Sequence, residues 1–269
     1  MLRRNLFLFC VSVFPAFQAN ADVSNQATRL ANLVAERPAN EGRVGTMHFH
    51  LENSSNRVRE RQAIMIHSEV ASTERIAIFF TQPSMIEETA FMSFNYKIAD
   101  DENWLYLPAT ERVRRLPSSD RGDYFLGTDL TYGDIKDNFK FGLEDWNFGV
   151  EEGLNEAGEE VTFLTGQART PDLGVEMGYA SFRARIDEES AFPVWIEYTD
   201  TVGDILKRVE VLDIGIIGGA HTALHFTAEN LQTGHKTGVK FTDMRHVPNL
   251  DDSIFDPDTL AFGIPDVEG

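Results

Sequence analysis

Short runs of alternating apolar and polar residues fill the sequence from residue 47 onward, and this period of two restricts most of the chain to β structure. In one run Val209 and Val211 alternate with Arg208 and Glu210, so one face of the strand is apolar and the other is polar. Turn-forming residues separate the runs, and strands do not alternate with helices, which favours an antiparallel sandwich or barrel. The predicted strands are residues 47–52, 61–69, 75–81, 91–98, 103–107, 140–149, 161–166, 174–187, 193–199, 205–213, 222–228 and 237–242.

One amphipathic helix is predicted before the strands. Ser24 or Asn25 can cap its start, and Pro38 with Gly42 ends it. Its apolar residues recur at spacings of three and four, at Ala27, Leu30, Ala31, Leu33 and Val34.

The first residues have the pattern of an export signal. Arg3 and Arg4 supply the positive part, residues 6–13 form an apolar run too short to span a bilayer, and Ala19-Asn20-Ala21 is a small-residue cleavage site. We therefore expect residues 1–21 to be a cleaved signal peptide, and the length of the remaining chain fits one large all-β domain or two small ones. The single cysteine, Cys10, lies in the signal, so the mature chain is expected to have no disulfide and no thiol nucleophile.

Charge excludes several classes of partner. The chain has 24 Lys and Arg against 43 Asp and Glu, a formal net charge of -19, which would repel nucleic acid and anionic membrane surfaces. No later segment has the roughly 20 consecutive apolar residues of a transmembrane helix. Strands with charges on both faces argue against a membrane-spanning barrel. The chain also has 20 Phe residues, most of which are expected to pack in a core.

Motifs for catalysis or metal binding are not found in the sequence. It lacks a nucleophile elbow, a Walker loop and a dinucleotide fingerprint, so we predict neither an enzyme nor a bound cofactor or metal. The pairs His48/His50 and His221/His225 could chelate a metal or could be ordinary strand histidines. An aspartate group resembles a calcium loop but is out of register, so a capped turn is the preferred interpretation; its members are Asp251, Asp252, Asp256 and Asp258.

A local basic spot interrupts this acidic sequence. Arg112, Arg114 and Arg115 stand close together, and Ser118 follows them. The arginines could pair with neighbouring acids on a solvated strand. Alternatively, they could gather with the hydroxyl group at the rim of a site that binds an anionic head group.

Four blocks around this spot carry a family resemblance. They read Trp-Leu-Tyr-Leu-Pro-Ala from residue 104, Arg-Val-Arg-Arg from 112, Ser-Ser-Asp from 118 and Gly-Thr-Asp-x-x-Tyr-x-Asp from 127. In this order and spacing they resemble the periplasmic LolA-like proteins of outer-membrane lipoprotein sorting. The resemblance extends to residues 79–91, 200–211 and 237–255. It departs from the family at Gly133, where an acid is common, and across residues 145–192, which do not match.

The resemblance implies that residues 22–269 form a single LolA-like lipid-binding domain in the periplasm. It implies a mainly β fold, a curved antiparallel incomplete barrel with a few covering helices and an apolar cavity that shields acyl chains. It also implies a lipid or acylated lipoprotein as cargo, and an inner-membrane exporter of the resistance-nodulation type as a plausible partner. Such a cavity suits a chain rich in Phe, Leu and Ile, because each sheltered methylene contributes about 0.8 kcal/mol to binding. The residues predicted at the cavity or its rim are Phe91, Phe94, Trp104 and Tyr106, and those predicted at its polar mouth are Arg112, Arg114 and Ser118.

Three functions follow from these observations. The first is a periplasmic carrier of lipid or lipoprotein acyl chains. The second is a non-enzymatic adaptor of an envelope complex or transporter, which would fill its own interior and expose an apolar patch. The third is a hydrolase that uses the histidines. A buried apolar pocket of ligand size favours the carrier over the adaptor.

Overall fold

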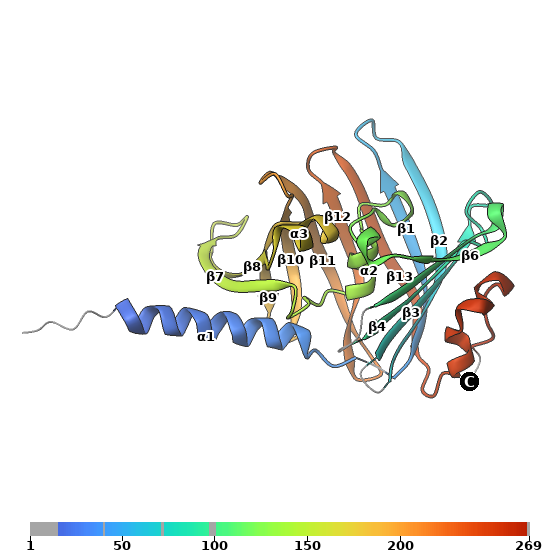
Figure 1. Cartoon of the computed structure of the whole chain (residues 1–269), viewed down its shortest axis with the longest axis horizontal. Coiled ribbons are helices and arrows are strands. Elements are labelled where there is room, and N and C mark those ends of the chain that lie inside the picture. Colours follow the sequence, from blue (N-terminus) through green and yellow to red (C-terminus); the bar gives the residue numbers. More distant parts are fainter. Residues whose placement is uncertain (1–15, 40, 71–72, 97–100, 268–269) are drawn as a thin grey trace, which may run out of the picture.

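One antiparallel sheet of thirteen strands makes up most of the protein in the computed structural model, which describes residues 16–39, 41–70, 73–96 and 101–267. The predicted curved, incomplete antiparallel barrel with few helices is confirmed (Figure 1). The strands are β1 (Arg43–Glu52), β2 (Val58–Val70), β3 (Thr73–Gln82), β4 (Ala90–Tyr96), β5 (Glu102–Leu107), β6 (Arg112–Leu116), β7 (Trp146–Leu154), β8 (Glu160–Ala168), β9 (Ser181–Asp187), β10 (Phe192–Thr199), β11 (Ile205–Ile217), β12 (Ala220–Asn230) and β13 (His235–His246). The helices are α1 (Ala16–Ala35), α2 (Tyr132–Asp137) and α3 (Pro171–Met177), with short 3-10 helices η1 (Pro108–Thr110), η2 (Ser118–Asp120), η3 (Phe125–Gly127), η4 (Asp252–Phe255) and η5 (Pro257–Phe262).

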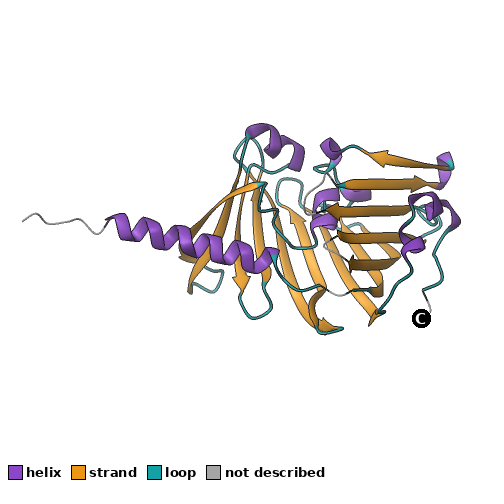
Figure 2. Cartoon of the chain, turned by 60° about the horizontal axis from the view of Figure 1, so that its bottom comes forward, coloured by secondary structure: helices purple, strands orange, loops and turns teal. Residues whose placement is uncertain are grey.

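Strand order leaves the sheet open. Strands β1 to β6 and strands β7 to β13 form two consecutive meanders, and antiparallel pairing of β1 with β13 joins them. Strands β6 and β7 are therefore the two edges of the sheet. Residues 117–145, which we call the crossing segment, connect these edges and carry α2. In Figures 1 and 2 the sheet curves around this segment, which lies on its concave side.

Helix α1 lies along β7 and β8 and closes that side of the sheet (Figure 2). Its apolar face is buried as predicted, at Ala27, Leu30, Ala31 and Val34. The predicted cap at Ser24 or Asn25 is wrong, because both residues lie inside α1, which neither Gly nor Pro interrupts before its end at Ala35. Residues 1–15 of the predicted signal, with Arg3, Arg4 and Cys10, lie outside the described residues.

The structure differs from the predicted strands at three places. Residues 174–187 are helix α3 followed by β9, because Thr170 caps a helix that Pro171 opens and that Gly178 ends at a φ of 79°. Strand β7 begins at Trp146 rather than at residue 140. Strand β6 was not among the predicted strands, and residues 97–98 of the predicted strand 91–98 lie outside the described part of the chain.

Both faces of the first meander are apolar. On the concave face Ile78 and Phe80 of β3 join the main core with α1 and the crossing segment. On the convex face Phe79 of β3 packs in a second cluster beneath the C-terminal tail. The tail contributes Ile254, Phe255 and Leu260 through η4 and η5. The sheet therefore serves as the middle layer between the crossing segment and the tail.

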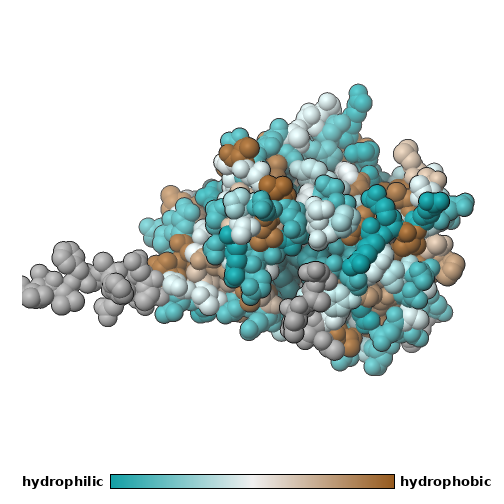
Figure 3. All heavy atoms as spheres, viewed as in Figure 1, coloured by the Kyte–Doolittle hydropathy of each residue, from teal (hydrophilic) through white to brown (hydrophobic). Residues whose placement is uncertain are grey.

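The surface seen in Figure 3 is mostly hydrophilic with scattered hydrophobic residues, in keeping with the net charge of -19. Within the described residues, no helix is both long enough and apolar enough to cross a membrane.

Leu260 and Phe262 provide a matched test of the tail. Leu260 is fully buried, whereas Phe262 is 84% exposed two residues later. Leu260→Ala is expected to lower the free energy of unfolding by about 3 kcal/mol, because it opens a cavity beneath the tail. Phe262→Ala should change it by less than about 0.5 kcal/mol. Urea unfolding of both variants measures the difference, and equal effects would contradict this packing.

Candidate functional site

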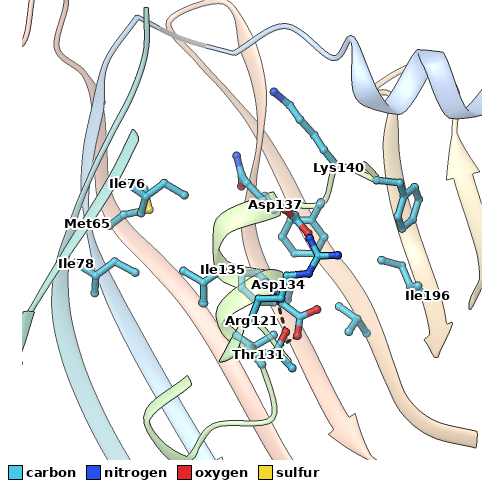
Figure 4. Close-up of a pocket in the computed structure, with 18 of the residues that line it drawn as sticks. Met65, Ile76, Ile78, Arg121, Thr131, Asp134, Ile135, Asp137, Lys140 and Ile196 are labelled. Atoms are coloured by element: carbon cyan, nitrogen blue, oxygen red, sulfur yellow. Dashed lines mark hydrogen bonds between the residues drawn. The ribbon is translucent and has the colours of Figure 1, made fainter. Parts of the chain in front are cut away.

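The concave side of the sheet contains an apolar hollow next to the crossing segment. Met65 of β2 and Ile76 and Ile78 of β3 face it from one meander, and Ile196 of β10 faces it from the other (Figure 4). Ile135 of α2 lies between these two walls (Figure 4). The cavity within it has a volume of about 90 Å³. Apolar strands and the crossing segment thus share the lining of the hollow.

Helix α2 is fixed at its start by a reciprocal cap. The backbone N–H of Asp134 donates to Oγ1 of Thr131 over 3.0 Å, and the backbone N–H of Thr131 donates to Oδ2 of Asp134 over 2.6 Å. This exchange satisfies two backbone donors at a helix start and sets the orientation of both side chains. Both residues line the hollow.

Asp134 also anchors α2 to the strand wall. The ammonium group of Lys207, on β11, contacts Oδ2 of Asp134 and the hydroxyl of Tyr179, although its side chain has no solvent exposure. The Tyr179 hydroxyl donates to Oδ2 of Asp134 over 2.9 Å, and its ring stacks on that of Tyr198 at a centroid distance of 4.2 Å. Burial lowers the pKa of Lys207, against the opposing effect of Asp134. Burial and the Asp134 carboxylate raise the pKa of Tyr179, which keeps its hydroxyl protonated as a donor.

A second anchor holds the start of the crossing segment. Oδ2 of Asp129 accepts a hydrogen bond from Oγ1 of Thr237 over 2.7 Å and lies 2.5 Å from Nδ1 of His235, both on β13. The backbone N–H of Asp129 donates a hydrogen bond to the Thr237 hydroxyl oxygen over 2.9 Å. Asp129, Thr131 and Asp134 all belong to the Gly-Thr-Asp-x-x-Tyr-x-Asp block of the sequence. In this structure the block attaches the crossing segment to the concave face.

The far end of α2 meets a buried ionic cluster. Nε2 of His67 on β2 lies 2.6 Å from Oε1 of Glu74 on β3, and both side chains are buried. Asn138 donates to the same Glu74 oxygen over 3.0 Å, and Lys140 lies 3.4 Å from the other. Arg37, which follows α1, donates to the backbone oxygen of Asn138 over 2.6 Å. Residues from α1, the crossing segment and the first meander therefore meet here.

The protonation states in this cluster follow from burial and charge. Burial, with the positive charge of Arg43, lowers the pKa of His67 to about 4. Burial alone would raise the pKa of Glu74, but the hydrogen bond from His67 and the charges of Lys140 and Arg43 bring it well below its usual range. The pair is therefore a neutral imidazole that donates to a carboxylate.

The four predicted aromatic residues lie on opposite faces of the sheet. Phe91 is buried on the concave side, where its ring contacts Phe125 and Tyr132 of the crossing segment at centroid distances of 5.3 Å and 5.4 Å. The other three belong to the convex cluster beneath the tail, and they are Phe94, Trp104 and Tyr106. Because residues alternate between faces, Phe91 and Phe94 point in opposite directions along β4. None of these four lines the cavity, and their contact with a ligand stays a prediction.

The predicted polar residues lie at the edge of the concave side. Arg112 and Arg114 are exposed on β6 and share the face of Leu116, which packs in the concave core. Neither has an ion pair within the described residues, whereas Arg115 pairs with Glu102 over 2.7 Å. Ser118 is exposed in η2. The arginines are thus placed at a rim, and their binding role stays a prediction.

His48, His50 and the aspartate group have ordinary partners. Nε2 of His48 lies 3.0 Å from the Thr242 hydroxyl, and Nδ1 of His50 lies 2.6 Å from Glu60. In the described part of the chain, no group of three or more His, Cys, Asp or Glu residues could hold a metal ion. Asp251 and Asp256 accept backbone hydrogen bonds that cap η4 and η5, which confirms the capped turn.

An open antiparallel sheet that curves around a helical segment defines a LolA-like half-barrel. A domain named for outer membrane lipoprotein sorting from Vibrio parahaemolyticus superposes with a TM-score of 0.78 at 24% identity, over 88% of this chain and 99% of that one. A DUF1329 family protein from Desulfovibrio piger gives 0.74 at 19% identity, over 90% and 98% of the two chains. A LolA superfamily protein from Nitrosomonas europaea gives 0.64 at 17% identity, over 86% and 98%. These likenesses establish the fold, which does not by itself fix the function.

A family model described as an uncharacterized protein matches residues 72–261, and the chain belongs to that family. Comparison with curated proteins gives no match.

The Lys207–Asp134 anchor can be tested by removing one charge. Asp134→Asn is expected to lower the free energy of unfolding by about 3 kcal/mol, because it leaves the buried ammonium of Lys207 without a counter-charge. The double variant Asp134→Asn/Lys207→Met should recover most of this loss, since no buried charge is then unpaired. Urea denaturation measures both. A double variant no more stable than the single one would contradict the role of the ion pair.

The buried His67 makes stability depend on pH. The unfolded chain binds a proton on this residue near pH 6.5, whereas the folded protein does so only near pH 4. Between these values the unfolded state holds more protons, so stability falls as the pH is lowered. The loss for this group is on the order of 3 kcal/mol. His67→Gln, which retains an N–H donor, should flatten the dependence of unfolding free energy on pH, and an unchanged slope would refute the assignment.

Proposed function

We propose that the protein is a periplasmic carrier that shelters the acyl chains of a lipid or an acylated lipoprotein in the concave hollow. The observation that carries this proposal is the apolar lining of the hollow, to which Met65, Ile78 and Ile196 contribute from three strands. Transfer of each methylene from water to such a lining gains about 0.8 kcal/mol, so binding needs no covalent chemistry. The likeness to a domain named for lipoprotein sorting supports the same function.

Cargo entry requires the crossing segment to move. The cavity of about 90 Å³ is smaller than the roughly 300–1,000 Å³ typical of ligand pockets. Helix α2 occupies the space between the two strand walls (Figure 4). Displacement of α2 would join the cavity to the open concave side while the sheet stays intact. In this proposal the anchors at Asp129 and Asp134 hold the empty state closed.

The mouth of the hollow would bind the polar part of the cargo. Arg112 and Arg114 project from the β6 edge on the concave side without ion-pair partners among the described residues. Guanidinium groups bind carboxylate and phosphate oxygens through paired hydrogen bonds. We assign these two arginines, with the hydroxyl of Ser118, to the anionic head group.

The remaining parts of the proposal concern the mature chain. We propose cleavage after Ala21, with residues 22–269 acting as one unit in the periplasm and without catalysis. The exposure of residues 23–25 fits this site, because the buried residues Ala27, Leu30, Ala31 and Val34 all follow it and would stay in place. An exporter of the resistance-nodulation type as partner rests on the sequence resemblance alone.

An adaptor of an envelope complex is the competing function. An adaptor would fill its hollow with its own side chains. The limited cavity volume is the observation that favours this function. Bound cargo distinguishes the two functions directly, because an adaptor would need none.

Native mass spectrometry of the mature protein, purified from periplasm without detergent, tests the carrier. A stoichiometric lipid or acylated peptide, identified after organic extraction, is the expected result. A mass equal to that of the bare polypeptide, unchanged after incubation with lipid extracts, would contradict the carrier and favour the adaptor.

Three variants locate the binding site. Ile135→Glu places a charge in the hollow and is expected to reduce bound cargo by about tenfold or more, because a carboxylate there disfavours acyl chains. Val202→Glu adds the same charge at a residue that is 82% exposed, and it should leave the amount of bound cargo unchanged. Equal amounts of cargo in the two Glu variants would rule out the hollow as the site.

The arginines at the mouth have a test of their own. Arg112→Ala/Arg114→Ala should weaken transfer to acceptor membranes with the fold intact.

A further inference from the structure

The convex face of the second meander is covered in an unusual way. The C-terminal tail lies on the β6 side of the sheet, away from β8 to β11 (Figure 1). Phe163 of β8 and Trp195 of β10 are nevertheless only 3% exposed each, and their ring centroids are 5.7 Å apart. Both lie on the convex face, because Leu164 and Ile196 next to them point into the concave core.

Arginine side chains supply the cover. The guanidinium carbons of Arg183 and Arg185 on β9 lie 5.4 Å and 5.8 Å from the centroid of the Trp195 ring. That of Arg208 on β11 lies 5.3 Å from it. These distances are within the range of cation–π contacts. We call Arg183, Arg185, Trp195 and Arg208 the arginine–tryptophan cluster.

A buried carboxylate fixes two of the three arginines. Glu197, which is 4% exposed, stands opposite Arg183 and Arg208 in the strand register. Its Oε1 accepts from Arg183 over 2.9 Å and its Oε2 from Arg208 over 2.8 Å. Within the described residues Arg185, which stands opposite Trp195, has one ion pair, a contact of 3.7 Å with the exposed Glu156. Arg185 is therefore the loosely held member.

Hydrogen-bond donors are left over in this cluster. Nε1 of Trp195, Nε of Arg185 and Nε of Arg208 are buried and have no acceptor among the described residues. Buried donors without partners are rare in folded proteins. Three such donors around one indole ring therefore indicate a place where an acceptor can bind. Guanidinium and indole nitrogens are donors only, so a group that binds to them must supply acceptor lone pairs.

The cluster gathers positive charge in an acidic chain. Its three guanidinium groups share the carboxylates of Glu197 and Glu156 within 4 Å, and Glu210, opposite Trp195 on the β11 side, also acts on Arg208. Three arginines side by side are a local departure from the formal net charge of -19.

We propose that the arginine–tryptophan cluster binds a phosphate group, either free or as the head group of a lipid. Arg185 releases Glu156 and turns toward the bound oxyanion, which accepts from Arg185, Arg208 and the indole N–H of Trp195. Planar guanidinium groups match phosphate oxygens bidentately, and Glu197 keeps Arg208 in place beneath the ligand. The site lies on the face opposite the hollow, so it goes beyond the proposed carrier function and does not depend on cargo in the cavity.

The indole N–H signals of the tryptophans offer a direct readout. The chain has three Trp residues, and Trp195→Phe assigns the signal of Trp195 by its loss. Nitrogen-15 NMR spectra of the mature protein would be recorded during titration with inorganic phosphate, and separately with dihexanoyl phosphatidylglycerol as monomers. A saturable shift of the Trp195 signal, with those of Trp104 and Trp146 unmoved, is expected for at least one of the two probes. A response to phosphate indicates the free ion as ligand, and a response to the lipid alone indicates a head group.

Matched variants make the test specific. Arg185→Ala is expected to weaken binding by about tenfold or more, because it removes a charged donor while leaving the Glu197 pairs intact. Arg169→Ala removes another partly exposed arginine, paired with Glu144 over 3.3 Å, and should leave binding unchanged. The proposal is overturned if neither probe shifts the Trp195 signal, if acetate shifts it equally, or if Arg185→Ala binds as tightly as the parent protein.

Discussion

Pairing of the first strand with the last determines the architecture of this protein. Antiparallel β1–β13 pairing joins two meanders into one open sheet and places β6 and β7 at its opposite edges. The chain must then pass from one edge to the other between residues 117 and 145, and it does so across the concave face. The apolar strands meet this crossing segment in the main core. The hollow, its closure and its polar anchors therefore all follow from one strand pairing.

The crossing segment combines apolar packing with ionic attachment. Phe125 and Leu130 are buried in the core, whereas Asp129 and Asp134 bond to β13 and β11. A buried ion pair adds little net stability, but it strongly disfavours any arrangement in which one charge is unpaired. Lys207 and Asp134 thus specify where α2 sits more than they strengthen the fold. A segment held in this way can leave its site as a unit if a ligand compensates for the lost contacts.

Local patterns predicted most strands, and they failed where the deciding contact is distant in sequence. Alternation predicts the strand around Val209, and the same alternation places Lys207 on the buried face, so a buried lysine was already marked in the sequence. Thr131 and Thr170 begin short helices through caps that the sequence contains, yet both helices were missed beside stronger strand patterns. Phe91 and Phe94 could have been separated by counting residues along the strand. The partner of Lys207, Tyr179, lies in the region without family resemblance and could not be found from the sequence.

The pairing of β1 with β13 also affects how the chain folds. The strand made first completes its hydrogen bonds on that side only when the strand made last arrives, so the closing contact spans nearly the whole sequence. Long-range pairing of this kind slows folding, because the chain loses the entropy of closing a large loop before the contact contributes any favourable free energy. Until then two half-sheets expose apolar faces and an unpaired edge, which are the features that promote aggregation. The interval between synthesis of β1 and arrival of β13 is therefore when this protein most needs protection from other chains.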